Sequence, residues 1–526
     1  MCAYWVAKIS SSFYSPSDLV YGASFRTRRI SYDPLVAIEA CLDGFIGNQD
    51  DQDPKTFKAW KVDVLAKCKD NIVNSRTISK ASNKSPLFSR REKQYLSFLH
   101  THLVIHYTDK TANNFAFRCK SDYVRTLADE LDNPRGTYDR EESTEDEIVK
   151  EHKRFLKPLH LFQGGKCERL GYLYIATKFH KDGQRFVAGM SNCSTTFLSK
   201  VLSDTCNFVL ETLREQDDER ILQTGVRRFF VVNGYEEVAS FIHSWHFDSK
   251  ASRTMRSGDF STMYTSLPLS KLKYNVTFAL TETWLYMAEK LDCDDSEVRL
   301  VWKPGKPCVW ARTVTSAEMH FKSRHSFTGQ ELHRMICWLV DNTFVVNAAI
   351  CRRQKIGLPM GTNCAPALCN LCLFTWEYLY IERLISTGRL DAARKHHMTF
   401  RLIDDILVLG NPFHDVFFQS CYPSFLTLND ATLEDGSVNF LGMHFKDTGS
   451  TSLSVDVYDK RRDFPFHVIR FPHLDSEIPV SIAYGVFVGQ LHRFKLICST
   501  YTAFVRNSCE VANTLGSQKS SFRRLQ

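Results

Sequence analysis

Hydrophobic and polar positions alternate in several segments of the chain, which predicts strands. GYLYIATKFHKDGQRFVAG (171–189) alternates on both sides of KDGQ, so we expect a hairpin with its turn at that tetrapeptide. MTFRLIDDILVLG (398–410) predicts a second hairpin, and VNFLGMHF (438–445) predicts one short apolar strand. NNFAFRCKSDYVRTLADEL (113–131) predicts a strand followed by a helix.

Other segments are typical of helices. We expect a helix from about Ser194 to Arg214, mainly helical structure over 270–350, and a long helix over 367–385. Pro366 suits the first turn of that last helix, and the loop before it is GLPMGTNCAP (357–366). No apolar run approaches the roughly 18 residues that a membrane span needs, so no membrane partner is expected.

Composition narrows the class of protein. At 526 residues, with 43% hydrophobic and 24% charged residues, the chain is typical of a folded protein with more than one lobe. Its 17 cysteines have no regular spacing, which favours a reducing compartment, so we expect an intracellular protein, nuclear or cytoplasmic. The net charge of +8 is compatible with a nucleic-acid partner but is weak support for one.

Two adjacent carboxylates, Asp404 and Asp405, interrupt an apolar run. An Asp pair in such a place is either a hairpin turn or a divalent-metal site, because a buried charge is costly unless it is paired or metal-bound. Asp259, in GDFSTMYTSLP (258–268), ends another apolar segment. If neighbouring strands carry Asp259 and Asp404 side by side, cations are needed to offset their repulsion, and two metal ions would suit phosphoryl transfer.

Three further segments have both a structural and a functional interpretation. The glycines of GLPMG let that loop lie flat against a ligand, or merely lead into the helix. Lys178 and Arg185 lie on either side of KDGQ and could reach a triphosphate, or belong to a solvated hairpin. CNLC (369–372) has the spacing of metal ligands, but buried helix cysteines explain it better.

In their order along the chain, these segments resemble the motifs of reverse transcriptases. DFSTMY (259–264) is similar to motif A of that family, and GLPMGTNCAP is similar to motif B. LIDDI (402–406) resembles motif C, and NFLGMHF (439–445) resembles motif E, the primer grip. YIATKFHKDGQRF and YDKRRDFPFHVIRFP are most similar to the Penelope-like branch, here expected without its C-terminal GIY-YIG nuclease. The resemblance covers roughly residues 95–515.

The resemblance implies an α+β polymerase right hand. Its parts would be an N-terminal extension of unknown role (1–95), fingers (96–245), a palm with an RRM-like antiparallel sheet (246–446) and a helical thumb (447–526). The implied activity is RNA-directed DNA synthesis by a retroelement enzyme or a derivative of one. The implied partners are an RNA template, a DNA or RNA primer and dNTPs. The implied cofactors are two Mg²⁺ ions, with Mn²⁺ as a substitute.

The resemblance also assigns roles to single residues. Catalysis and metal binding would fall to Asp259, Asp404 and Asp405. Contacts with the dNTP would come from Lys178, Arg185, Tyr264, Met360 and Gly361, with Tyr264 as the gate against ribose. Contacts with nucleic acid would come from Leu441 and Gly442 of the primer grip and from His492, Arg493 and Lys495 of the thumb, beside Phe487 and Phe494.

Two positions depart from the family pattern. Leu402 replaces the Tyr that precedes the aspartates, and Asn429 stands where relatives often have a Lys that could protonate pyrophosphate. One alternative is therefore a catalytically weak or inactive domesticated protein that only binds RNA. Another is an RNA-dependent RNA polymerase, against which the bulky Tyr264 argues. The oligomeric state is open.

Overall fold

A computed structural model describes most of the chain from residue 101 onward. The described ranges run from 101 to 516 with gaps at 135, 163–167, 180–182, 245–252, 262, 313–324, 450–452 and 465–479. Before residue 101 only 5–6, 39, 59, 61–66, 94 and 97–99 are described, so the predicted N-terminal extension lies largely outside the described residues.

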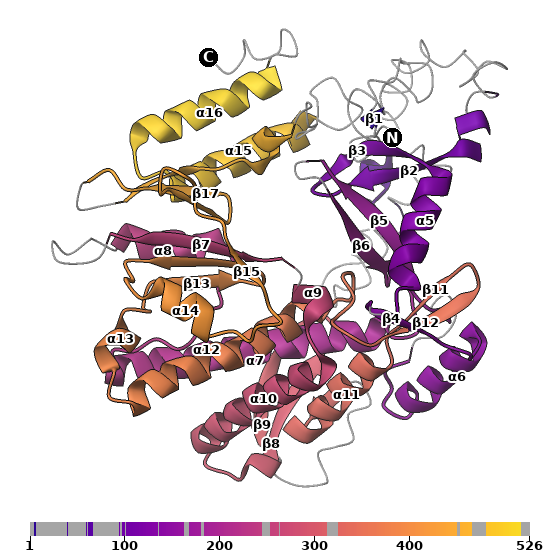
Figure 1. The fold of residues 1–526 in the computed structure, drawn as a ribbon, viewed down its shortest axis with the longest axis horizontal. Helices are drawn as coiled ribbons and strands as arrows, with labels where there is room; N and C mark the ends of the chain where they lie inside the picture. The colour runs from indigo at the N-terminus through magenta and orange to yellow at the C-terminus, as the bar shows by residue number, and fades with distance from the viewer. Residues whose placement is uncertain are drawn as a thin grey trace.

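The first folded unit, coloured indigo to purple in Figure 1, is built on a sheet of order β1–β3–β2–β5–β6, called the N-terminal sheet below. Its strands are β1 (Trp5–Val6), β2 (Leu103–Thr108), β3 (Thr111–Cys119), β5 (Tyr172–Lys178) and β6 (Gly183–Gly189). β5 and β6 pair antiparallel from Tyr172↔Gly189 to Lys178↔Gly183, which confirms the predicted hairpin. Helix α5 (Lys120–Leu131) follows β3, as the sequence predicted.

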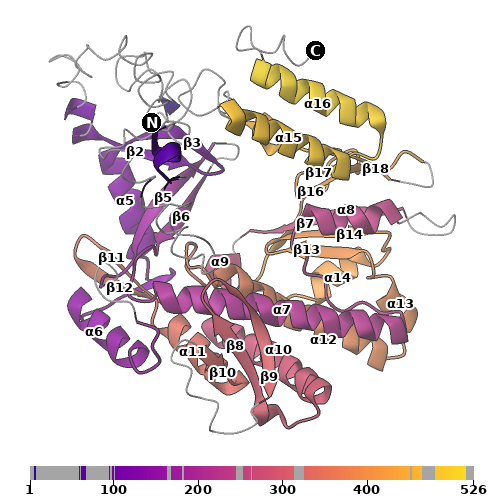
Figure 2. The same cartoon turned by 180° about the vertical axis from the view of Figure 1, so that it is seen from behind.

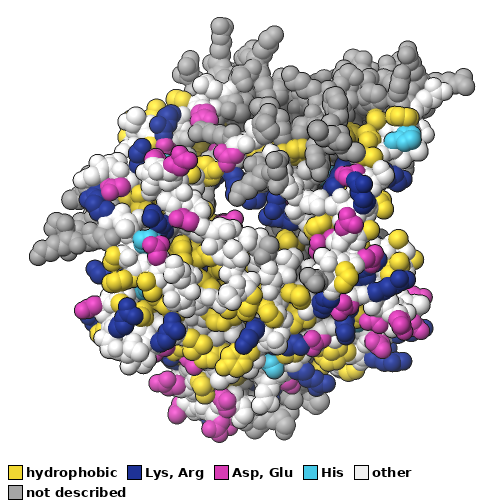
Figure 3. All heavy atoms as spheres, viewed as in Figure 1, with side chains coloured by type: hydrophobic (Ala, Val, Ile, Leu, Met, Phe, Trp, Pro, Cys, Tyr) yellow, Lys and Arg dark blue, Asp and Glu magenta, His cyan; other side chains and the backbone are white. Residues whose placement is uncertain are grey.

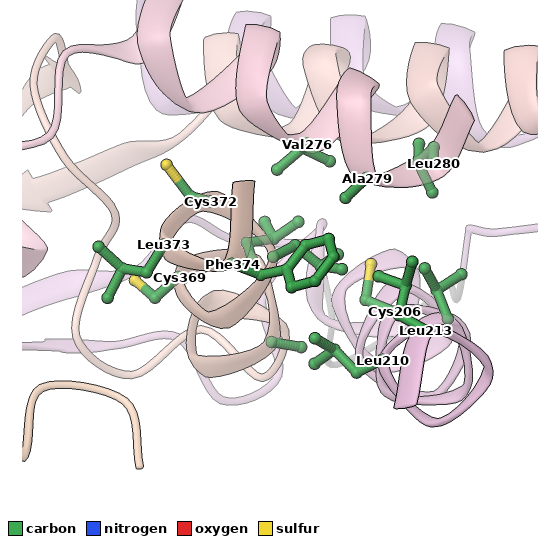
Figure 4. Packing of buried hydrophobic residues seen from close by; sticks show 14 of the residues in the cluster. Cys206, Leu210, Leu213, Val276, Ala279, Leu280, Cys369, Cys372, Leu373 and Phe374 are labelled. Atoms are coloured by element: carbon green, nitrogen blue, oxygen red, sulfur yellow. The ribbon is translucent and has the colours of Figure 1, made fainter. Parts of the chain in front are cut away.

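The largest hydrophobic core surrounds three long helices. These are α7 (Thr196–Thr224), α10 (Leu269–Leu291) and α12 (Ala365–Ser386). Figure 4 shows Phe374 of α12 pointing toward side chains of α10 and α7, and Figure 2 shows α7 crossing the molecule beside α12. Cys369 and Cys372 are fully buried there, which confirms that CNLC is a core segment. α7 extends ten residues beyond the predicted Arg214 end, to Thr224, where Gly225 at φ 67° ends the helix.

The prediction that 270–350 is mainly helical is wrong in its middle. After α10 the chain forms β8 (Val298–Lys303), β9 (Lys306–Arg312) and β10 (His325–Phe327) before helix α11 (Gly329–Asp341). β8 and β9 pair around a turn that contains Gly305 at φ 67°, and β8 buries every second residue. This strand pattern in VRLVWK was the missed indication. A further sheet joins β11 (Phe344–Asn347), β12 (Ile350–Gln354) and β4 (Tyr138–Arg140), beside helix α6 (Glu145–Leu156).

The central sheet has the order β13–β14–β7–β15 and is antiparallel throughout. Its strands are β13 (Thr399–Leu402), β14 (Asp405–Leu409), β7 (Met255–Phe260) and β15 (Leu428–Asp430). Alternate residues of β14 enter different cores: Ile406 and Val408 face the helical core, and Leu407 and Leu409 face a second one. Burial on both faces explains the uninterrupted apolar run of this strand.

The second core lies between the central sheet and the C-terminal elements (Figure 1). Those elements are β16 (Val438–Phe440), β17 (Met443–Lys446), β18 (Ser454–Val457), α15 (Val480–Ile497) and α16 (Tyr501–Gly516), joined by α8 (Tyr235–Ser244). VNFLGMHF is a hairpin, not the single strand predicted, because Leu441 (φ 49°) and Gly442 (φ 76°) form a turn inside it. The shorter elements are α9 (Met263–Ser266), η3 (Asp295–Glu297), α13 (Leu390–Arg394), α14 (His414–Ser420) and η5 (Lys460–Asp463).

The fold is therefore mixed α and β with antiparallel sheets, in agreement with the α+β prediction. Among the described helices, none combines the length and the apolar character that crossing a membrane requires.

Candidate active site

The central sheet brings the three predicted aspartates together. Asp405 on β14 is the register partner of Asp259 on β7, and the backbone N–H of Phe260 donates to the carbonyl of Asp404 at 3.0 Å. Residues in register on neighbouring antiparallel strands point to the same face. The carboxylates of Asp259 and Asp405 therefore share one face of the sheet, with Asp404 beside them in the turn.

The turn that carries Asp404 has an unfavourable backbone. Its first residue, Ile403, has φ 54°, a conformation that β-branched residues rarely adopt. Arg401, which is 0% exposed, donates to the carbonyl of Ile403 at 3.2 Å. The same guanidinium donates to both oxygens of Glu377, at 2.5 and 3.0 Å, and Tyr422 donates to Glu377 at 2.7 Å. The buried ion pair of Arg401 and Glu377, whose hydrogen bonds are satisfied, thus supports the turn through the carbonyl of Ile403.

Burial and mutual repulsion disfavour the charged form of this cluster. The pKa of Asp404 is raised, first by burial and then by the charge of Asp259. Although Asp405 opens onto solvent, the surrounding protein and then Asp404 and Asp259 raise its pKa to about 6. A bound cation would relieve this repulsion.

The carboxylates line a cavity of about 590 Å³ together with basic side chains. Lys178 and Arg185, from the β5–β6 hairpin, are among its lining residues. Lys178 is the register partner of Gly183, and Arg185 that of Ala176, so the two cations occupy the same face of the hairpin. In Figure 3, Lys and Arg side chains gather where this face of the molecule is hollowed. The structure thus places the predicted phosphate-binding residues beside the aspartates.

Tyr264 and Met360 also line this cavity. Tyr264 lies in the short helix α9 directly after β7, and burial raises the pKa of its hydroxyl above the usual range. Its backbone carbonyl accepts from Leu358 at 2.8 Å, so the GLPMG loop is fixed against α9.

The two glycines of that loop approach protein backbone where a side chain would otherwise lie, and their contact with a ligand stays a prediction. A Cβ on Gly357 (φ 77°) would come 2.0 Å from the carbonyl of Tyr264, and one on Gly361 (φ 129°) would come 1.9 Å from that of Ala188. Gly361 does not belong to the residues that line the cavity. Its lack of a side chain instead lets β6 approach the loop, where Ala188 donates to the carbonyl of Met360 at 2.7 Å.

The predicted nucleic-acid contacts lie on the C-terminal elements. Leu441 and Gly442 form the β16–β17 turn, and Arg493 of α15 donates to the carbonyl of Gly442 at 3.4 Å. His492 and Lys495 on α15 are exposed.

Phe494, which we expected beside the backbone of a nucleic acid, is only 1% exposed. It packs in the second core, because it lies on the apolar face of α15 that covers the central sheet. Phe494 is therefore not available to a nucleic acid. Phe487, the other aromatic residue named with it, is partly buried against the same core.

Asn429 lies on β15 as the register partner of Asp259, on its side away from Asp405. It therefore reaches the carboxylate face of the sheet, but from an exposed position. An amide at this place is no useful proton donor. Within the described part of the chain, no group of three or more His, Cys, Asp or Glu side chains is arranged to hold a metal ion, so metal binding stays a prediction.

Lys110 and Lys460 complete the basic lining of the cavity, and no role was predicted from the sequence for either. Lys110 belongs to the turn between β2 and β3, and Lys460 begins η5. They come from opposite ends of the described chain, so only the fold brings them to the aspartates.

No protein-family model matches the chain, and neither does any curated protein. Among solved structures, telomerase from Candida albicans in complex with the TWJ fragment of telomeric RNA is similar, with a TM-score of 0.44 and 11% identity. That likeness covers 78% of this chain but 62% of the telomerase chain. Apo telomerase from Candida tropicalis has a TM-score of 0.44 and 13% identity over 69% of this chain and 56% of its own. Telomerase from Candida tropicalis with the TWJ fragment has 0.43 and 11%, over 92% and 72%.

Proposed function

We propose that this chain is an RNA-directed DNA polymerase that adds deoxynucleotides to a primer 3′-hydroxyl. The observation that carries the proposal is one cavity that holds Asp259, Asp404 and Asp405 together with Lys178 and Arg185. These residues are far apart in the sequence, yet they meet in the combination that the order of the reverse-transcriptase motifs implies. In this proposal the N-terminal sheet belongs to the fingers, the central sheet to the palm and α15–α16 to the thumb.

The donor atoms of the site fit divalent magnesium. Mg²⁺ prefers oxygen ligands and is usually held by one or two carboxylates plus the phosphates of the substrate. Asp259 and Asp404, assisted by Asp405, would supply the carboxylates for two Mg²⁺ or Mn²⁺ ions. When bound, such ions lower the pKa of the attacking hydroxyl and neutralise charge on the triphosphate.

The other side chains would orient the substrates. Lys178 and Arg185 would hold phosphates of the incoming dNTP, and Met360 would contact the nucleotide. Tyr264, fixed by the backbone bond to Leu358, would exclude a ribose 2′-hydroxyl. The exposed His492 and Lys495 would contact the phosphate backbone of the RNA template and its primer, independently of sequence. The similarity of the hairpin segment to Penelope-like proteins supports an origin in that branch.

Primer extension on an RNA template tests the proposal. We expect the purified chain to extend a DNA primer with dNTPs and Mg²⁺ or Mn²⁺, and we expect Asp404→Asn and Asp405→Asn to abolish extension while primer–template binding is retained. Asp430→Asn is the matched control, because Asp430 is an exposed carboxylate on the same sheet that does not line the cavity. Undiminished extension by both Asp404→Asn and Asp405→Asn would refute the assignment.

Asn429 supports a second candidate, a palm protein that binds RNA without efficient synthesis. In that case the wild-type chain binds primer–template but extends no primer with either metal ion. Tyr264→Ala tests the sugar preference of an active enzyme: ribonucleotide incorporation should rise, and an unchanged preference would contradict the steric role of Tyr264.

A further inference from the structure

The turn that carries Lys110 lies at the edge of the cavity and is fixed there by contacts of the neighbouring Asp109. Lys110 has φ 63°, an uncommon backbone for lysine, which indicates that the turn is fixed by its surroundings. The neighbouring Asp109 donates its backbone N–H to the carbonyl of Thr177 on β5 at 3.0 Å. The carboxylate of Asp109 also pairs with Arg185 on β6 at 3.3 Å. The Lys110 turn is therefore tied to both strands that supply Lys178 and Arg185.

Lys110 and Lys460 both line the cavity, and their amino groups are close enough for the charge of one to disfavour the charge of the other. Although Lys110 is exposed, the protein that surrounds it and then the charge of Lys460 lower its pKa to about 8. Two ammonium groups repel at such a distance, and neither can accept a hydrogen bond from the other while charged. An anion placed between them would turn the repulsion into two charge-assisted hydrogen bonds.

Both lysines act on the catalytic cluster. The charge of Lys110 lowers the pKa of Asp404 and of Asp405, and the charge of Lys460 lowers that of Asp405. The lysine pair is thus within electrostatic range of the carboxylates that would bind the metal ions. Arg185 already has Asp109 as a partner, and Lys110 and Lys460 add two further cations to the lining of the cavity.

We propose that Lys110 and Lys460 form a pyrophosphate subsite that binds the β- and γ-phosphates of the incoming nucleoside triphosphate and holds the pyrophosphate after transfer. This inference rests on the proposed function for its role in the reaction, but the binding of the anion itself does not. A phosphate chain fits the pair because it offers several oxygens close together, as two adjacent ammonium groups require. The backbone phosphates of a nucleic acid are spaced along a strand and would each meet one lysine.

Binding of inorganic pyrophosphate to the full chain, without metal ion or nucleic acid, tests the subsite directly. We expect Lys110→Gln and Lys460→Gln each to raise the Kd by about tenfold, because each removes one charge-assisted hydrogen bond. The changes should be less than additive in the double variant, because the two amino groups hold one anion. Lys200→Gln is the matched control, since Lys200 is an exposed lysine of α7 outside the cavity.

Thermal unfolding shows whether the variants are folded, so that a loss of structure is not mistaken for a loss of pyrophosphate binding. Without ligand, the double variant should differ little in stability from the wild type, since it loses a like-charge contact together with the attraction of both lysines to the aspartates. Pyrophosphate should raise the Tm of the wild type and of Lys200→Gln, but raise that of the double variant far less.

Activity separates failure of the subsite from failure of the polymerase. If the wild type extends primers, the double variant should show a raised KM for dNTP with primer–template affinity unchanged. If the wild type extends nothing but pyrophosphate binding still depends on both lysines, the polymerase proposal fails and the subsite stands. An unchanged Kd for pyrophosphate in the double variant overturns the subsite, whether or not the chain is a polymerase. So does a loss of primer–template affinity alone, which would assign the lysines to the nucleic-acid backbone.

Discussion

Two hairpin turns, one at the cavity and one among the C-terminal elements, are built alike but supported differently. The β13–β14 turn places Ile403 at φ 54°, and the β16–β17 turn places Leu441 at φ 49°. Each has an arginine that donates to a turn carbonyl. Arg401 is wholly buried and bonds both the turn and Glu377. Arg493 is partly exposed and lies over the ring of Tyr235 at 5.4 Å.

The two arginines differ in how many of their guanidinium nitrogens are hydrogen-bonded. Arg401 has hydrogen bonds from each of its guanidinium nitrogens, to Glu377, Asn370 and the turn. In Arg493, Nε is buried without a hydrogen-bond partner among the described residues. A fully bonded buried charge fixes its surroundings, whereas a partly bonded one leaves alternatives of similar energy. We infer that the turn with Asp404 is held rigid and that the predicted primer-grip turn can adjust.

The largest expected effect comes from breaking the support of the first turn. Arg401→Met leaves Glu377 buried without its cation, which should lower the free energy of unfolding by about 3–5 kcal/mol. Chemical denaturation measures the change. Arg401→Lys keeps the charge but loses the bidentate geometry, so its loss should be intermediate. A loss below about 1 kcal/mol for Arg401→Met would mean that the ion pair does not support the turn.

The stability of the segment that leads into the first turn should also depend on pH. His396, fully buried three residues before β13, has its pKa lowered to about 4 by burial from an ordinary 6.5. The unfolded chain takes up this proton below pH 6.5 and the folded chain only near pH 4, so stability falls as pH drops through this window. The loss should reach about 3 kcal/mol. Unfolding measured from pH 7 to pH 4 checks it.

Two variants attribute this pH dependence. His396→Phe should reduce the slope of stability against pH, and so should His152→Phe, since burial also lowers the pKa of His152 to about 4. The same slope in His396→Phe and in the wild type would contradict the assignment to His396.

A smaller effect is expected from crowding the second turn. Gly442 has φ 76°, and a Cβ there would come 2.2 Å from Nη2 of Arg493. Gly442→Ala should cost about 1–2 kcal/mol for the left-handed backbone, while the flexible arginine moves aside. If the turn is adjustable, the variant folds normally and loses primer–template affinity. A loss as large as that of Arg401→Met would show that the second turn is as rigid as the first.

The smallest effect should follow from Arg493→Met. It removes a 3.4 Å hydrogen bond and the contact with Tyr235 but keeps most of the apolar stem, so we expect a loss of about 1 kcal/mol. Chemical denaturation of Arg493→Met and Arg401→Met, compared with the wild type, measures how much each arginine contributes to stability.

The sequence predicted the parts of the site that lie within one strand or one turn. Alternation located the β5–β6 and β13–β14 hairpins, and the common position of Asp259 and Asp404 at strand ends anticipated their meeting. Periodicity did not separate the β16–β17 hairpin from a single strand, because its turn has no polar residue. Lys110, Lys460 and the support of Arg401 by Glu377 depend on contacts between distant segments, which no local pattern encodes.

The backbone hydrogen bond from Ala188 to Met360 ties the β5–β6 hairpin to the loop before α12. With no side chain on Gly361 to separate them, β6 and this loop touch directly. If the hairpin closes over the cavity, we therefore expect it to rotate about Ala188. Arg185 lies three positions further toward the hairpin tip, about 10 Å along the strand, so a small rotation at this pivot sweeps the cations through a much larger arc. The missing side chain of Gly361 thus fixes the point about which Lys178 and Arg185 would move together.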